Sequence, residues 1–116
     1  MPEISKDLVA ATSIPLVLSI LTENETYGYE LIKKIKERSG GKLEFAEGTI
    51  YPVLKKMEEK NWISSKWKLG NTDKQRKYYR ITSAGKKQLQ TEKNNWLTIH
   101  NLFEQLWKTQ INLSWK

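Results

Sequence analysis

Residues 48–69 read GTIYPVLKKMEEKNWISSKWKL, and the hydrophobic period changes once within them. The first part repeats its apolar residues at the i, i+3, i+4, i+7 spacing of a helix with one buried face, which predicts a helix over residues 48–60. These apolar residues are Ile50, Val53, Leu54 and Met57. Pro52 stands near the start of that helix, where its missing N–H costs a single backbone hydrogen bond. From Trp62 onward apolar and polar residues alternate, which predicts a half-buried strand whose outer face carries lysines.

A second strand is predicted over residues 77–82, after a polar segment at 70–76 that is too long for a tight hairpin turn. Alternation of side chains places Tyr79 towards the core, and in the first strand it places Trp67 and Leu69 there. The two strands therefore form a ribbon with a cationic tip.

The segment that begins the chain predicts a mostly buried helix. Ser5 or Asp7 can start it, because both residue types cap helix N-termini. Pro15 lies within the apolar run and leaves two alternatives open. Either the helix kinks at this proline, or Ser13 caps a helix whose first turn includes it.

A further helix is predicted over residues 27–38, with Thr26 as its N-cap and an apolar side that faces the core. Residues 39–41, Ser-Gly-Gly, end it. The glycines Gly48 and Gly85, further along the chain, are expected to be structural, needed for chain entry or close packing.

The C-terminal segment predicts one long helix with Thr82 as its N-cap. Apolar residues recur in it every seven positions, in two series. The series are Leu89, Trp96 and Phe103, and Ile99, Leu106 and Leu113. A domain of this size has little core left to cover such a seam, so we expect it to pack against a second copy of the chain. The expected division is residues 1–82 for a first domain and residues 83–116 for a dimerisation helix.

Charge and composition limit the classes of function that the protein can have. The chain of 116 residues has a formal net charge of +7, and residues 55–80 alone carry nine basic and three acidic side chains. This concentration favours a polyanionic partner. Cysteine is absent and His100 is the single histidine, so we expect no catalysis, no metal and no cofactor. No apolar run approaches the roughly 20 residues of a membrane helix, and no secretory signal is present, so we expect a cytoplasmic protein with no membrane partner.

The order helix, helix, helix, strand, basic turn, strand is that of a winged helix-turn-helix, in which the third helix enters the major groove of DNA and the hairpin touches the flanking backbone. The predicted fold class is therefore mainly α (α+β), with a two-stranded β wing and a C-terminal dimerisation helix. Three blocks of sequence occur in a characteristic order. They are YGYEL at 27–31, GTIYPVL at 48–54 followed by Met57-Glu58, and RKYYRIT at 76–82 followed by Ala84-Gly85. Together they resemble the PadR family of bacterial transcriptional regulators.

The resemblance implies a homodimeric repressor that binds pseudo-palindromic operator DNA and is released by a small molecule. It implies DNA contacts from the second and third helices and from the wing, by Tyr27, Tyr29, Thr49, Tyr51, Lys55, Lys74, Arg76 and Lys77. It also implies that Trp96 stacks on a flat aromatic effector between the two protomers. The expected dimer interface consists of Leu89, Trp96, Ile99, Phe103 and Leu106. The wing departs from the family, because residues 73–76 read DKQR where relatives often have GGRR.

Two other functions fit the same pattern. A winged helix can bind protein or RNA instead of an operator, since a fold does not determine a function. The second alternative is a dimer that sequesters a ligand and has lost DNA binding. Individual residues have plain structural readings too, because Tyr51 can be a packed aromatic with its hydroxyl at the surface and Trp96 can be a dimer-core residue only.

Overall fold

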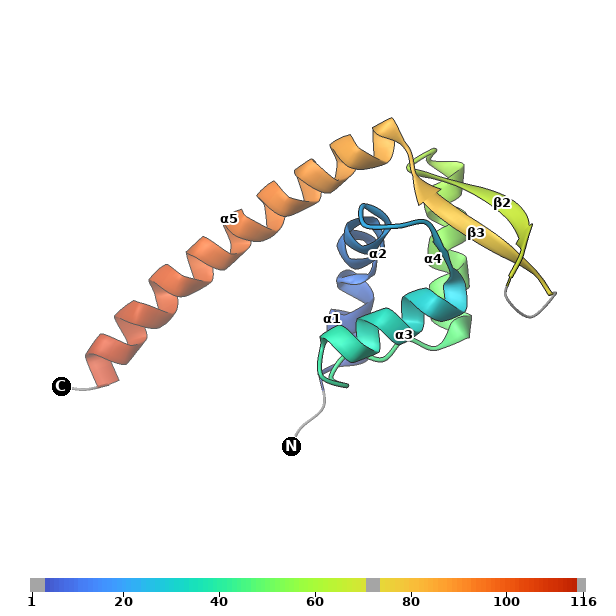
Figure 1. Ribbon diagram of the computed structural model, residues 1–116. Helices are drawn as coiled ribbons and strands as arrows, with labels where there is room; N and C mark the ends of the chain where they lie inside the picture. Colours follow the sequence, from blue (N-terminus) through green and yellow to red (C-terminus); the bar gives the residue numbers. More distant parts are fainter. Residues whose placement is uncertain (1–3, 71–73, 115–116) are drawn as a thin grey trace.

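The computed structural model describes residues 4–70 and 74–114, which form five helices and a three-stranded antiparallel sheet (Figure 1). The elements run in the order α1 (Lys6–Ala11), α2 (Ser13–Leu21), β1 (Thr26–Tyr27), α3 (Gly28–Arg38), α4 (Glu47–Glu59), β2 (Ile63–Leu69), β3 (Gln75–Ile81) and α5 (Ser83–Ser114). This is the predicted winged helix-turn-helix with a long C-terminal helix. The β2–β3 hairpin is called the wing below.

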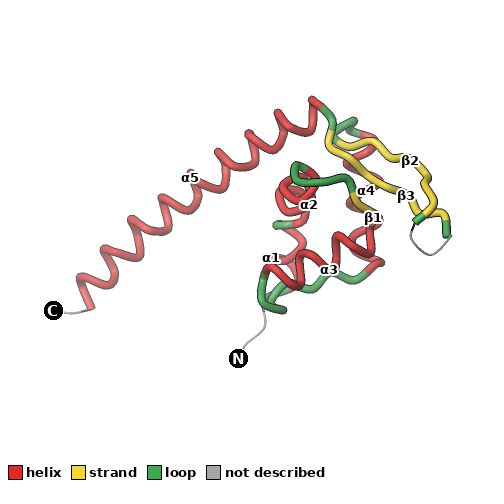
Figure 2. The backbone as a smooth tube through the Cα atoms, in the orientation of Figure 1, coloured by secondary structure: helices red, strands yellow, loops and turns green. Residues whose placement is uncertain are grey.

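One hydrophobic core joins α2, α3 and α4 to the root of the sheet. Its fully buried side chains come from four elements, which explains why the helical periodicities of the sequence converge on one centre. They are Val17, Leu18, Leu31, Ile50, Leu54, Met57 and Ile63. The wing and α5 leave this body in different directions, as the tube in Figure 2 shows. The helix α5 accounts for most of the elongated shape, whose principal extents are 64 × 33 × 21 Å.

The N-terminal segment resolves the alternative that Pro15 left open. Thr12 separates α1 from α2, and Pro15 lies in the first turn of α2, where its missing N–H has no intrahelical partner to lose. Ser5 caps α1, since its side chain accepts a hydrogen bond from the Leu8 N–H at 3.2 Å. Ser13 does not cap α2 as predicted, because its hydroxyl donates to the Ala10 carbonyl instead, at 2.7 Å.

The predicted cap at Thr26 is wrong. Thr26 and Tyr27 form the short strand β1, which pairs with Tyr79 and Tyr78 of β3, and α3 begins only at Gly28. The sheet therefore has three strands where the sequence indicated two. The reason is tertiary: β3 offers a free edge, and pairing with it satisfies backbone groups that a helix N-terminus would leave without partners.

The wing alternates as predicted, but it extends past the core. β2 and β3 pair antiparallel from Ile63↔Ile81 to Leu69↔Gln75, and only the root of the hairpin is covered by helices (Figure 1). Trp67, which the alternation placed inward, is 63% exposed. It lies on the same side of the sheet as buried Ile63, yet no core lies beneath it. The predicted burial of Trp67 and Leu69 is therefore wrong.

The start of α5 is anchored to the body. Thr82 is the N-cap, as predicted, because its hydroxyl accepts a hydrogen bond from the Gly85 N–H at 3.0 Å. A Cβ on Gly85 would lie 2.0 Å from the Trp62 carbonyl oxygen, so close packing requires glycine there. Gly48 has no heavy atom within 4 Å of such a Cβ, and close packing does not explain that glycine.

Across the described ranges, residues 4–70 and 74–114, no helix combines the length and the apolar character that a membrane crossing needs.

Candidate nucleic-acid interface

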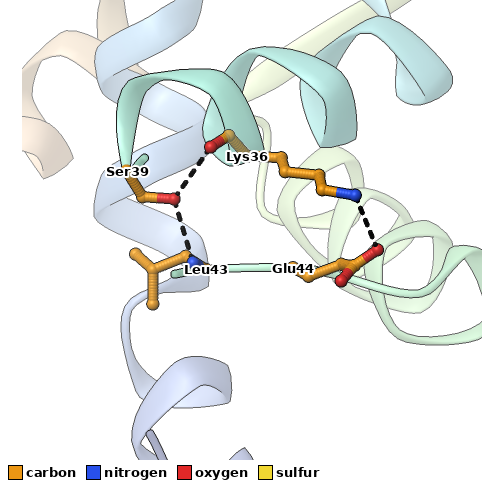
Figure 3. Close-up of polar contacts among 4 residues, drawn as sticks. All are labelled: Lys36, Ser39, Leu43 and Glu44. Atoms are coloured by element: carbon orange, nitrogen blue, oxygen red, sulfur yellow. Dashed lines mark hydrogen bonds and ion pairs between the residues drawn. The ribbon is translucent and has the colours of Figure 1, made fainter. Parts of the chain in front are cut away.

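The turn between α3 and α4 directs the first turn of α4 to the surface. Ser39 ends α3 by donating its hydroxyl to the Lys36 carbonyl at 3.1 Å, and it accepts a hydrogen bond from the Leu43 N–H at 2.9 Å (Figure 3). Lys36 pairs with Glu44 at 3.3 Å across the same turn. Both glycines at positions 40–41 have positive φ angles, 64° and 82°, which favour glycine. The sequence predicted this stop, but not the side-chain bonds that hold it.

The exposed side of α4 carries three of the predicted contact residues. Thr49 and Lys55 are exposed, and Tyr51 is 42% exposed. The Tyr51 ring lies against the first residue of α3, since a Cβ on Gly28 would come within 2.6 Å of it. Gly28 is thus a site residue that sequence reasoning missed, although it stands in the YGYEL block. Its missing side chain makes room for the tyrosine.

The environment of Tyr51 raises the pKa of its phenol. Burial is the main cause, nearby Glu47 raises the pKa further, and Arg76 lowers it. A phenol is protonated at neutral pH even at its ordinary pKa near 10, so the hydroxyl can donate and accept hydrogen bonds at the surface of α4.

Cations and aromatic rings alternate along the part of the wing that lies beside β1. The Arg76 guanidinium lies 4.4 Å from the ring centroid of Tyr27, which in turn meets Tyr78 edge-on at 5.3 Å. Lys68 lies 4.9 Å from the Tyr78 ring and pairs with Glu25. These contacts hold both cations in place beside β1 and the start of α3.

The inner face of the wing is tied to α4. Lys77 pairs with Glu58 of α4 at 3.3 Å, and the Ser65 hydroxyl of β2 donates to the same carboxylate. Tyr79, beneath them, is buried, and its pKa is raised by burial, by Glu58 and by Tyr51. The helix α4 and the wing are therefore joined by polar contacts in addition to the core.

Between α4 and the wing runs an open groove of about 780 Å³, called the wing groove below. It brings together five of the eight predicted DNA contacts, from β1, α4 and β3, and adds Trp67 of β2. The five are Tyr27, Tyr51, Lys55, Arg76 and Lys77. Trp67 was missed because its alternation resembles that of a core residue. Its position three residues before the polar segment at 70–76 was the one signal in the sequence that Trp67 lies near the wing tip, beyond the core.

The other three predicted contacts lie outside the groove lining. Thr49 is exposed at the start of α4, Tyr29 is exposed on α3, and Lys74 is exposed at the end of the wing. The unusual DKQR segment begins at residue 73, and residues 71–73 lie outside the described residues.

The helix α5 has a different surface. Six side chains cover one side of it beyond its first turns, and they are called the α5 apolar face below. They are Trp96, Ile99, Leu102, Phe103, Leu106 and Trp107, all exposed except Trp96, which is half-buried. Phe103 and Trp107 stack at 4.9 Å with an interplanar angle of 6°.

The predicted interface residues fall into two groups. Leu89 is only 6% exposed and belongs to the core of the chain itself, whereas Ile99, Phe103 and Leu106 are free on the surface. His100 pairs with Glu104 at 3.3 Å on the polar side of the helix. The side chain of Leu113 lies outside the described residues.

No cluster of three or more potential ligands (His, Asp or Glu) is placed to hold a metal ion within the part of the chain that the structure describes.

Comparison with known proteins agrees with this geometry. The model of the transcriptional regulator PadR-like family matches residues 17–91, from α2 into α5. A solved PadR family transcription regulator from hypervirulent Clostridium difficile R20291 is 36% identical, with a TM-score of 0.72, over 82% of this chain and 97% of that one. A transcriptional regulator from Clostridium thermocellum superimposes with a TM-score of 0.80 at 28% identity, over 88% of this chain and 96% of that one.

Two curated relatives match at lower identity. The negative transcriptional regulator PadR of Bacillus subtilis (strain 168) is 28% identical over 97 residues, which cover 84% of this chain and 51% of that protein. This chain therefore spans about half the length of that relative. An uncharacterized protein of Lysinibacillus sphaericus is 28% identical over 101 residues, 87% of this chain and 93% of that protein.

Proposed function

This chain belongs to the PadR-like family of transcriptional regulators, and from that premise we propose that it is a homodimeric repressor of operator DNA that a small planar aromatic ligand releases. Members of this family are regulators of transcription and not enzymes. The repressor role follows the relative from Bacillus subtilis, which is a negative regulator. Such a protein acts where the chromosome lies, in the cytoplasm.

The observation that carries the proposal is the wing groove. It gathers cations and tyrosines from α4 and from the wing on one side of the molecule, where a single duplex can meet both. In this arrangement Thr49, Tyr51 and Lys55 of α4 reach the major groove, while Lys74 and Arg76 hold the flanking backbone. Tyr27, Tyr29 and Lys77 complete the contacts to phosphate.

The α5 apolar face supports the proposed dimer. At 100° per residue its six side chains span an arc of roughly 140°, wider than the seam of a two-helix coiled coil. The same arc can cover a partner's α5 together with the partner's α1, on which Leu8 is exposed. We therefore propose that residues 83–116 make the dimer and residues 1–82 bind DNA, with Leu89 joining the two parts.

The ligand site is proposed beside Trp96. This indole is half-buried and belongs to the α5 apolar face, so a dimer would enclose it between protomers. A flat aromatic molecule that binds better to a dimer geometry unsuited to DNA weakens operator binding by the ratio of its affinities for the two states.

The test is fluorescence anisotropy of a labelled duplex taken from upstream of the protein's own gene, compared with a scrambled duplex at two salt concentrations. We expect a preference of several hundredfold or more for the natural duplex, because specific sites commonly exceed random DNA by about 10³ or more. Equal, salt-sensitive binding to both duplexes contradicts an operator reader.

The ligand is tested separately by quenching of tryptophan fluorescence with flat aromatic compounds. Quenching should be much weaker in Trp96→Phe than in the wild type. Identical titrations of the two proteins would remove the ligand site from Trp96, and would leave operator binding unaffected.

A module that binds protein is the second candidate. Exposed Trp67 and Leu69 on the wing favour it, because exposed apolar side chains are typical of protein interfaces. Lys55, Arg76 and Lys77 line the same groove as Trp67 and favour nucleic acid. Absence of binding to either duplex would favour this candidate.

A further inference from the structure

Glu58 is a groove residue to which the proposed DNA contacts assign no role. It extends from α4, and its carboxylate contacts both strands of the wing. The Ser65 hydroxyl donates to it from β2, and the Lys77 ammonium of β3 lies 3.3 Å from it. Lys77 also lies 5.6 Å from the ring centroid of Tyr79.

Lys77 consequently differs from two other cations proposed to contact DNA. Lys55 and Lys74 are exposed, and neither has an ion pair within the described residues. The charge of Lys77 is already neutralised inside the groove, where its side chain is 37% exposed. A phosphate therefore has to replace the Glu58 carboxylate before it gains this cation.

We propose that Glu58 is a specificity-determining residue, which withholds Lys77 from phosphate until a duplex is seated in the wing groove. The proposal rests on the proposed function. Both side chains line the groove between α4 and the wing, and the exposed cations Lys55 and Lys74 are the first to meet a duplex. A loosely held, random duplex neutralises those cations and leaves the Glu58–Lys77 pair intact.

The exchange of partners leaves neither group isolated. After a phosphate takes Lys77, the Glu58 carboxylate keeps the hydrogen bond from Ser65, and Lys77 keeps its place over the Tyr79 ring. The operator complex therefore includes one phosphate contact more than the random complex. The dependence of affinity on salt should be steeper for operator by about one unit per added contact.

The experiment compares Glu58→Gln with Glu59→Gln. The control removes the same charge one residue later on α4, from a side chain that lines the same groove and has no ion pair within the described residues. The operator is selected by the wild-type protein from a pool of random-sequence duplexes, and a single random duplex of equal length is the reference. Thermal unfolding confirms that both variants fold.

On the random duplex, Glu58→Gln should bind roughly two- to fivefold more tightly than Glu59→Gln, the range expected when a partly exposed ion pair no longer competes. Its salt dependence there should be steeper than that of the wild type by about one unit. On the operator the slopes of Glu58→Gln and wild type should agree, because Lys77 contacts phosphate in both. In a Lys77→Gln background, Glu58→Gln should produce none of these changes.

Equal effects of the two glutamine substitutions would overturn the proposal, since general charge repulsion would then explain both. Weaker binding of Glu58→Gln to both duplexes would also overturn the proposal, because Glu58 would then have only a structural role in positioning the wing. If the wild type selects no operator from the pool, the proposed function fails, and this proposal fails with it.

Discussion

The wing groove and the α5 apolar face both expose large aromatic side chains, but the neighbours of those aromatics differ. In the groove, exposed Tyr51 and Trp67 share the lining with Arg76 and Lys77, which lie over the rings of half-buried Tyr27 and buried Tyr79. On α5, Phe103 and Trp107 stack on each other with no cation over either ring among the described residues. Aromatics between cations suit a polyanion, whereas an aromatic and aliphatic face without charge suits another protein surface. Exposure alone would not distinguish the two.

The largest effect should come from a charge placed on the α5 apolar face. Phe103→Glu would bury an unpaired carboxylate in the proposed interface, which costs about 3–5 kcal/mol and raises the dimer dissociation constant by roughly two to three and a half orders of magnitude, at about 1.4 kcal/mol per tenfold change. Sedimentation equilibrium measures this change. The matched control is Leu97→Glu, because Leu97 is also exposed on α5 but projects from the opposite side of the helix. Equal dissociation of both variants would contradict the proposed face.

The second effect concerns the joint between the body and α5. Gly85→Ala should lower the free energy of unfolding by about 2–3 kcal/mol, because its Cβ meets the Trp62 carbonyl oxygen and backbone cannot yield as a side chain can. Gly48→Ala is the control on α4, where the Cβ meets nothing, and it should raise stability by about 0.5–1 kcal/mol. Urea unfolding measures both. A neutral Gly85→Ala would show that α5 can shift on the body.

The third prediction separates two roles within the groove region. Lys74→Ala with Arg76→Ala should weaken binding to every duplex and lower the salt slope by about two units, since two phosphate contacts are lost. Tyr51→Ala should instead reduce the preference for operator over random DNA, with little change in slope. Anisotropy titrations at several salt concentrations measure both quantities. An equal loss of specificity from both variants would refute this division.

Gly28→Ala tests whether the position of the Tyr51 ring matters for recognition. The new Cβ would push that ring aside without meeting backbone, so discrimination should fall as in Tyr51→Ala while the free energy of unfolding changes little. A stable variant with full discrimination would show that the ring position is not important for recognition.

The smallest effect should be a loss of stability at alkaline pH. The pKa of Tyr79 is raised, first by burial, so the folded state keeps the phenol proton at a pH where the unfolded chain loses it. The contribution of this phenol to the free energy of unfolding is complete below its pKa in the unfolded chain, which is near 10. The contribution is lost as the pH rises through the pKa of the folded state. Tyr79→Phe should make the decline of unfolding free energy above that pH shallower. An unchanged decline would show that other groups cause the loss of stability. The first of these to test is Tyr51, whose pKa is also raised, by the variant Tyr51→Phe.

The predictable part of this molecule is the part that local periodicity controls. The apolar spacing of Ile50, Leu54 and Met57 predicts α4, and the core buries all three. The cap at Thr82 was also predictable, because a threonine before a long helical pattern satisfies N–H groups of that helix. The site could be anticipated as a set of residue types on α4 and on the wing, because the blocks that carry them are short and local.

Other features could not be read from periodicity. Thr26 belongs to a strand because it pairs with the edge of β3, at Tyr79, more than 50 residues later. Trp67 is exposed because the wing extends beyond the core. The Glu58–Lys77 pair requires the relative positions of α4 and β3, which no spacing within either segment contains.

The sequence by itself determined the helices, the alternation of the strands, the concentration of charge and the family, because each depends on neighbours along the chain. Only the tertiary structure decided which cations are free and which are already paired, which aromatics are covered, and which glycines are indispensable. Those properties depend on the distance between segments, and the packing of the core sets that distance.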